Sequence, residues 1–153
     1  MANAAAVQQN MQRVLVGAIA IEHQLESLIV DRTFEGETGS KLSFFVNNIL
    51  AAEWFTFSAK RRLAVHIVSD QERLRGPEKG EFEQLLGKVI RYRNAMAHGR
   101  VVEKNDGTYL SYFESSPRET LLSDEYWEEL ERVFRRATEL CWEALKLSRI
   151  PTG

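Results

Sequence analysis

The sequence lacks most of the features that would place it among secreted, membrane-bound or disulfide-rich proteins. It contains one cysteine, Cys141, so a disulfide framework and a CxxC metal motif are both excluded. No apolar run approaches the ~20 residues that a membrane-spanning helix needs. The alanine-rich start carries no basic segment of the kind that opens a secretory signal. We therefore expect a cytoplasmic protein without a membrane segment.

The motifs of several large enzyme classes are absent as well. The chain has no P-loop, no glycine-rich dinucleotide motif, no nucleophile elbow and no internal repeat. Its net charge of −2 argues against a protein that coats DNA nonspecifically, but it leaves room for a local basic cleft. The nearest approach to a metal site, Glu22-His23 with Glu26, has no partners elsewhere, so no metal or other cofactor is predicted.

What is present is the composition and the apolar periodicity of a helical domain. With 153 residues, 44% apolar and 27% charged, we expect residues 1–150 to form one domain. Apolar residues at three- and four-residue steps predict helices over about 4–30, 40–50, 58–74, 81–98 and 123–148. Ser58 and Ser123 are the expected N-caps of the third and last helices. Cys141 lies in the apolar stripe of the last helix and should be buried.

Between the last two helices the sequence period changes from that of a helix to that of a strand. Strand-forming residues around the turn Asn105-Asp106-Gly107 predict a hairpin over about 101–113, which Ser115-Ser116-Pro117 is expected to end. The predicted fold is therefore all-α. It is an up-and-down bundle of four to five helices with a small β-hairpin inserted before the last helix.

The first predicted helix carries an apolar seam with the spacing of a coiled coil. A helix of about 27 residues is about 40 Å long, which exceeds the ~30 Å diameter of a small domain. The seam therefore either lies buried in its own chain or packs in part on another chain. Its residues are Val7, Met11, Val14, Ala18, Ile21, Leu25 and Leu28.

Residues 91–100 concentrate the side chains that suggest chemistry. They end the fourth predicted helix, where Gly99 is expected to form a left-handed cap and the helix dipole favours a protonated His98. Asn94 lies one turn before His98 on the same face. Arg93 is rotated from His98 by about 140°. Both side chains can still reach one cleft if this helix end packs against a second copy.

An arginine, an amide and a histidine in one cleft can cleave RNA without a metal. The guanidinium binds a phosphate oxygen, and the histidine accepts the 2′-OH proton or returns a proton to the leaving 5′ oxygen. On this interpretation Arg93, Asn94 and His98 are catalytic. The alternative is structural: His98 caps the helix, Arg93 extends into solvent and Asn94 is a surface amide.

Four further residues are predicted to bind the substrate. Arg91 and Arg100 flank the catalytic candidates, and Lys60 opens a basic run of three residues that would follow RNA phosphates if it lies beside the cleft. Tyr109, with Tyr112, is placed to stack on bases if the hairpin walls the cleft. The alternatives are that the basic run is a solvated face and that the tyrosines cover the bundle.

The pattern Arg93-Asn94-x-x-x-His98, followed by Gly99, resembles the R-N-x-x-x-H motif of HEPN domains, the R-x4-6-H superfamily. The resemblance implies an all-α bundle that dimerises and brings two motifs together. It also implies a metal-independent endoribonuclease of a toxin–antitoxin, anti-phage or stress system, leaving 2′,3′-cyclic phosphate and 5′-OH ends. Arg93, Asn94 and His98 match the motif positions. The hairpin after Gly99 departs from a minimal helical bundle.

Two other functions remain open from the sequence. In the first, the same residues form a non-catalytic module that binds nucleotide, RNA or a protein. In the second, the chain is an oligomerisation unit built on the seam of the first helix. The expected partners are RNA, a second copy of the chain, and an antitoxin or regulatory protein.

Overall fold

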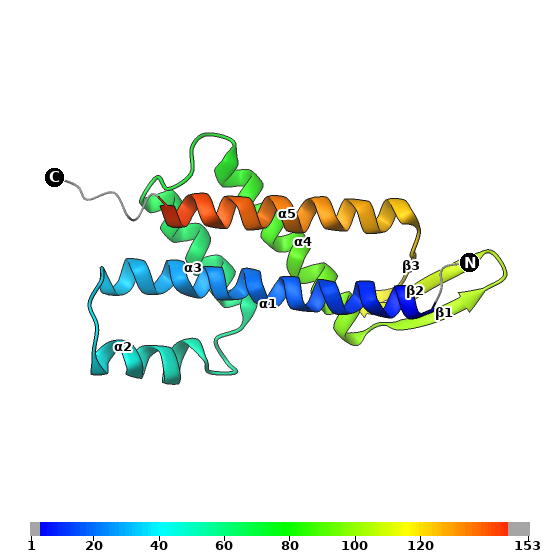
Figure 1. Ribbon diagram of the computed structural model, residues 1–153, viewed down its shortest axis with the longest axis horizontal. Coiled ribbons are helices and arrows are strands. Elements are labelled where there is room, and N and C mark those ends of the chain that lie inside the picture. The colour runs from blue at the N-terminus through cyan, green and yellow to red at the C-terminus, as the bar shows by residue number, and fades with distance from the viewer. Residues whose placement is uncertain (1–3, 147–153) are drawn as a thin grey trace.

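The computed structural model describes residues 4–146, which form five α-helices, one π-helical turn and a small sheet (Figure 1). The elements are α1 (Ala4–Phe34), α2 (Ser40–Phe45), η1 (Val46–Leu50), α3 (Phe57–Asp70), α4 (Glu78–His98), β1 (Arg100–Lys104), β2 (Gly107–Glu114), β3 (Ser116–Leu121) and α5 (Asp124–Lys146). The prediction of a mostly helical protein with a small antiparallel β-element before the last helix is confirmed.

The apolar seam of α1 packs inside its own chain. Six of its seven residues are buried, and Met11 is half-buried. The hypothesis that this seam packs on another chain is therefore wrong for these six residues. The large apolar side chains that α1 leaves exposed, Val16 and Ile19, lie outside the seam.

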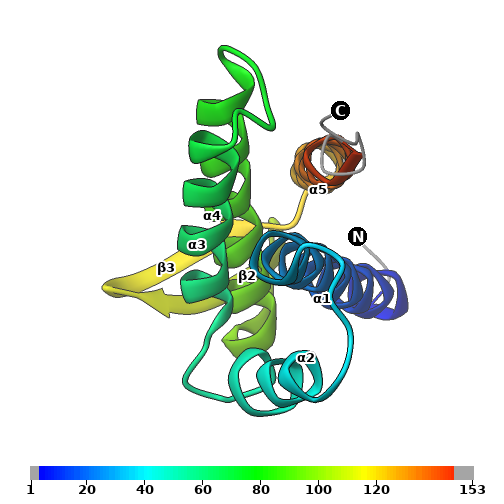
Figure 2. The same ribbon diagram turned by 90° about the vertical axis from the view of Figure 1, so that its left-hand side faces the viewer.

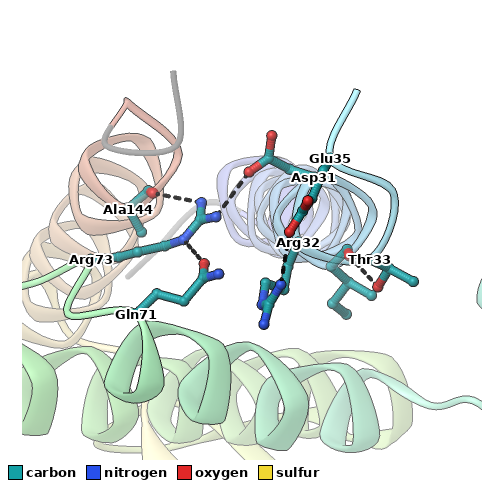
Figure 3. Close-up of polar contacts among 8 residues, drawn as sticks. Asp31, Arg32, Thr33, Glu35, Gln71, Arg73 and Ala144 are labelled. Carbon is teal, nitrogen blue, oxygen red and sulfur yellow. Dashed lines mark hydrogen bonds and ion pairs between the residues drawn. The ribbon is translucent and has the colours of Figure 1, made fainter. Parts of the chain in front are cut away.

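The helices form two crossed pairs rather than an up-and-down bundle. Helices α1 and α5 lie side by side and run in the same direction, whereas α3 and α4 cross them (Figures 1 and 2). Arg73 joins the ends of the first pair, because its guanidinium donates to Asp31 Oδ2 at 3.0 Å and to the Ala144 carbonyl at 3.3 Å (Figure 3). The up-and-down topology is wrong because the sheet and α4 return the chain to the end where α1 begins, so α5 repeats the direction of α1.

The buried side chains form two apolar clusters. The larger one lies among α1, α3, α4 and α5 and contains Cys141, whose predicted burial is confirmed. The smaller one joins the first half of α1, the end of α4, the sheet and the start of α5. Its buried members are Val7, Val14, Ala95, Met96, Leu110, Leu122 and Leu130. The smaller cluster holds the last turn of α4, and therefore His98, against the sheet.

The predicted hairpin is part of a three-stranded antiparallel sheet with the order β1-β2-β3. Lys104 pairs with Gly107 around the expected turn. The expectation that Ser116 and Pro117 end the structure is wrong, because they begin β3 and Pro117 pairs with Phe113. Ser115, at a φ of 49°, reverses the chain. Proline has no N–H to donate, and an edge strand tolerates it because one side of that strand has no partner strand.

The helix ends follow the expected chemistry in one place and depart from it in two. Ser123 caps α5 by accepting a hydrogen bond from the Tyr126 N–H at 3.3 Å, as predicted. Thr56, rather than Ser58, caps α3, because its hydroxyl oxygen accepts from the Ala59 N–H at 3.3 Å. A threonine two residues earlier offers the same acceptor.

Gly99 is extended, with φ −79° and ψ 163°, instead of forming the predicted left-handed cap. The chain passes from His98 directly into β1, which requires an extended residue at this position. A Cβ on residue 99 would lie 2.7 Å from Leu110 Cδ1 and would also meet the Ala95 carbonyl. The close approach of α4 and β2, and not a positive φ, is therefore what requires glycine here.

Candidate functional site

The last two turns of α4 divide cleanly into a buried and an exposed face. Ala95 and Met96 are buried in the smaller apolar cluster. Arg91, Asn94 and His98 are exposed. They follow one another at steps of three and four residues, so they share one face of the helix.

This exposed face is one wall of a cleft of about 500 Å³. We call it the α4–sheet cleft, because the opposite wall comes from the sheet and from the start of α5. It is lined by Lys88, Arg91, Tyr92, Asn94, Ala95, His98, Tyr112, Phe113, Glu114, Thr120 and Tyr126. Its volume lies in the range of ligand pockets, ~300–1,000 Å³.

The charged side chains of the α4–sheet cleft are mostly cationic. Lys88 lies 3.4 Å from Glu129, in an exposed ion pair that screening makes weak. Within residues 4–146, neither Arg91 nor His98 forms an ion pair. Their N–H donors are therefore open to an anionic ligand such as a phosphate. Glu114 is the one carboxylate in the lining.

Three tyrosines, Tyr92, Tyr112 and Tyr126, form the half-buried floor of the cleft. The rings of Tyr92 and Tyr126 meet edge to face, with centroids 5.8 Å apart and planes at 83°. Burial raises the pKa of Tyr126 well above its usual value, and the neighbouring phenols of Tyr92 and Tyr112 raise it further. The Tyr126 phenol therefore stays neutral and acts as a hydrogen-bonding group, not as a proton acceptor in its ionised form.

Arg93 lies outside the α4–sheet cleft. Its side chain lines a separate cavity of about 730 Å³ together with Lys60, Ile90 and Asn94. Its Nη1 donates a 2.9 Å hydrogen bond to Asn94 Oδ1. Within one chain the structure therefore does not bring Arg93 and His98 together, whereas Asn94 borders both spaces.

Lys60 is 5% exposed and forms ion pairs with two carboxylates. Its Nζ lies 2.7 Å from Glu22 Oε1 and 2.6 Å from Glu26 Oε1, both on α1. Burial alone would lower the pKa of Lys60, but the hydrogen bonds and charges of Glu22 and Glu26 outweigh burial and raise it. Lys60 is thus a structural cation between α1 and α3 and is not free to bind phosphate.

The other two predicted substrate-binding residues also lie away from the cleft lining. The Tyr109 hydroxyl donates to Asp106 Oδ2 at 2.9 Å, and Lys104 Nζ lies 4.8 Å from the centre of its ring. Arg100 is exposed and begins β1, where it pairs with Ser111. Of the predicted site residues, Arg91, Asn94 and His98 line the cleft together, and so does Tyr112, which was predicted with Tyr109.

Two features of the cleft lining were not predicted: the shared helix face of Arg91 and His98, and the presence of Phe113 and Glu114. The sequence alone places Arg91 and His98 on one helix face, since seven residues bring a helix back to nearly the same face. Six residues separate the two, a spacing that also satisfies R-x4-6-H. Nothing in the sequence around Phe113 and Glu114 indicated that they line a cleft. They do so because β2 passes α4 in the folded chain.

Within residues 4–146, no three His, Cys, Asp or Glu side chains converge as a metal site. Over the same span, no helix combines the length and apolar character that a membrane crossing requires. Comparison of the chain with known protein families, with curated proteins and with solved structures gave no match.

Proposed function

We propose that the protein is a metal-independent endoribonuclease of the HEPN type and that the α4–sheet cleft holds the scissile phosphate. The observation that carries the proposal is the presence of Arg91, Asn94 and His98 on one helix face of one cleft. Arginine and lysine suit an anionic phosphodiester, and aromatic side chains suit an unstacked base.

In the proposed reaction, His98 accepts the proton of the 2′-OH and the 2′ oxygen attacks the phosphorus. The bond from phosphorus to the 5′ oxygen breaks, and that oxygen receives a proton from His98 of the same or of a second copy. The products are a 2′,3′-cyclic phosphate and a 5′-OH. Arg91 stabilises the charge that grows on the phosphate oxygens, a contribution of about 3–4 kcal/mol for one well-placed donor. Acid–base catalysis by a histidine contributes ~10²–10⁴-fold.

Arg93 has a different role from Arg91. In the single chain, Arg93 acts on the cleft through Asn94, whose amide oxygen it binds. In the homodimer that the motif resemblance implies, the second copy is the route by which Arg93 reaches a phosphate. A cytoplasmic location and a regulatory or antitoxin partner belong to the same proposal.

One observation favours the non-catalytic alternative, in which the cleft binds RNA or a nucleotide without cleaving it. Within residues 4–146, His98 has no hydrogen-bond partner that would orient its ring. A catalytic histidine is commonly oriented by a second group, so under the ribonuclease proposal the bound substrate or the second copy supplies that contact.

The deciding experiment compares RNA cleavage by three proteins in EDTA: wild type, His98→Ala and His66→Ala. His66 is exposed on α3, which makes it a matched histidine control outside the cleft. We expect wild type and His66→Ala to cleave and His98→Ala to lose at least 100-fold. Cleavage that persists in His98→Ala would rule out this mechanism. RNA binding without cleavage by any of the three would favour the binding module.

A further inference from the structure

The α4–sheet cleft contains two neighbouring residues that phosphate binding does not explain. Phe113 is 74% exposed, the largest exposed fraction among the large apolar side chains of residues 4–146. Glu114 adds a negative charge to a cleft whose other charged groups are Lys88 and Arg91. An exposed phenyl ring costs free energy in water, and a carboxylate repels a phosphate.

Phe113 has the position of a stacking platform. It lies near the end of β2 and lines the cleft together with the residues of α4 that would hold a phosphate. In proteins that bind single strands, exposed aromatic rings beside cations stack on bases, while the cations hold the backbone. A base within a duplex is already stacked on its neighbours, so this ring requires an unpaired nucleotide.

Glu114 has the position of a group that contacts the edge of that base. Phe113 and Glu114 both line the α4–sheet cleft, and as successive residues of β2 their side chains leave the strand in different directions. Within residues 4–146, Glu114 forms no ion pair, and its two oxygens are open acceptors. A carboxylate with two free oxygens matches a base that offers two adjacent N–H donors. Among the four RNA bases, guanine alone presents such a pair, at N1 and the exocyclic amine.

We propose that Phe113 and Glu114 form a guanine-binding subsite of the α4–sheet cleft. Phe113 stacks on the face of the base, and Glu114 accepts hydrogen bonds from N1–H and the exocyclic N–H. Lys88 and Arg91 hold the attached phosphate. The subsite rests on the proposed function, because it selects an unpaired guanosine next to the bond that His98 cleaves. It also accounts for the one carboxylate in a cationic cleft.

The test uses the four nucleoside 3′-monophosphates, whose binding to the full chain is measured by calorimetry and requires no cleavage. We expect guanosine 3′-monophosphate to bind at least tenfold more tightly than the uridine, cytidine and adenosine forms. Glu114→Gln should remove this preference, because the amide cannot accept both hydrogen bonds. Phe113→Ala should weaken all four nucleotides about tenfold. Glu143→Gln on α5 and Phe44→Ala on α2 are exposed controls that should change nothing.

Two outcomes overturn the subsite. Equal affinity of wild type for all four nucleotides would do so. An equal gain in affinity for all four in Glu114→Gln would also do so, because Glu114 would then only repel phosphate. Neither result bears on cleavage, which the His98→Ala experiment tests separately. Conversely, a guanine preference that depends on Glu114, in a protein that cleaves no RNA, would establish the subsite and reject the ribonuclease. Thermal unfolding of each variant confirms that it is folded.

Discussion

Arg91 and His98 lie seven residues apart on α4 and line the same cleft, whereas Arg93 lies outside it and binds Asn94 Oδ1 at 2.9 Å. The two arginines are therefore not equivalent. Arg91 is placed to touch a phosphate in the cleft, and Arg93 is placed to orient the amide of Asn94. If the cleft cleaves RNA, replacing Arg91 and replacing Arg93 should lower the rate of cleavage by different amounts.

Replacing Arg91 should impair cleavage more than replacing Arg93. We expect Arg91→Ala to lower kcat/KM for RNA by ~10²–10³, because a donor to the developing phosphate charge is lost. Arg93→Ala should cost about tenfold through a misoriented Asn94. Arg75→Ala, in the exposed loop between α3 and α4, is the matched control. A loss in Arg93→Ala as large as in Arg91→Ala would point to a composite site in which a second copy supplies Arg93.

Removing the Lys60 ammonium should destabilise the fold without touching the cleft. Lys60→Met leaves Glu22 and Glu26 facing one another without a cation, so we expect a loss of about 2–3 kcal/mol in the free energy of unfolding in urea. The value lies below the usual range for a buried pair because both carboxylates are about one-quarter exposed. Adding Glu22→Gln and Glu26→Gln should restore most of the loss. A fully stable Lys60→Met would show that these contacts contribute little.

The ion pair between Glu81 and Arg136 should make stability depend on pH. The hydrogen bonds of Arg136, at 2.9 and 3.0 Å, lower the pKa of Glu81 below its ordinary value of 4.5. A lowered pKa in the folded state adds stability above pH 4.5 that is lost as the pH falls through the folded-state pKa. Glu81→Gln should thus cost about 0.5–1 kcal/mol at pH 7, since the pair is partly exposed.

The same comparison at low pH provides the check on that assignment. Once Glu81 is protonated in wild type, the stabilities of wild type and Glu81→Gln should converge. Glu143→Gln replaces an exposed carboxylate on α5 and is the control. It should leave the dependence of stability on pH unchanged. A difference between wild type and Glu81→Gln that stays constant from pH 7 to pH 3 would mean that packing, and not charge, is responsible.

The buried thiol should report unfolding. Burial raises the pKa of Cys141 to about 12, so at pH 8 the thiol is protonated and shielded. We expect no reaction with Ellman's reagent in the native protein and complete reaction in urea. The urea concentration at which half of the thiol reacts should match the midpoint of the unfolding curve. An exposed cysteine introduced as Ser69→Cys should react at once and serves as the positive control. Fast labelling of native Cys141 would contradict its place in the core.

A side chain at residue 99 should disturb the junction between α4 and β1. In Gly99→Ala the new Cβ would meet Leu110 Cδ1 at 2.7 Å and the Ala95 carbonyl. We expect a loss of about 1–3 kcal/mol in stability, together with lower cleavage because His98 is the preceding residue. Gly80→Ala is the matched control, since a Cβ there meets nothing within 4 Å. Equal stability of the two variants would show that α4 and β2 can separate without cost.

Local pattern was enough to predict most of the elements. Three- and four-residue apolar steps located α1, α4 and α5, because a helix that buries one stripe must repeat at that period. The turn at Asn105–Gly107 and the cap at Ser123 depend on side chains within a few residues, and both occur where the sequence predicts them. The burial of Cys141 followed from the same periodicity.

What local pattern could not supply was the pairing of segments that are distant in the chain. The second strand pairing, β2 with β3, was missed because Ser116-Pro117 reads as a break, although it begins an edge strand. Lys60 was predicted to face solvent or RNA, yet it pairs with carboxylates 34 and 38 residues away. Likewise, the direction of α5 relative to α1 depends on the path of the sheet and not on either helix.

The sequence by itself therefore determined the helices, the turn after β1 and the presence of an arginine, an amide and a histidine near the end of α4. These follow from the spacing of residues along one element. Only the tertiary structure decided that Arg91, and not Arg93, shares a cleft with His98, and that Phe113 and Glu114 line the same cleft. A cleft is formed by elements that pack across the chain, so its lining depends on how the smaller apolar cluster joins α4 to the sheet.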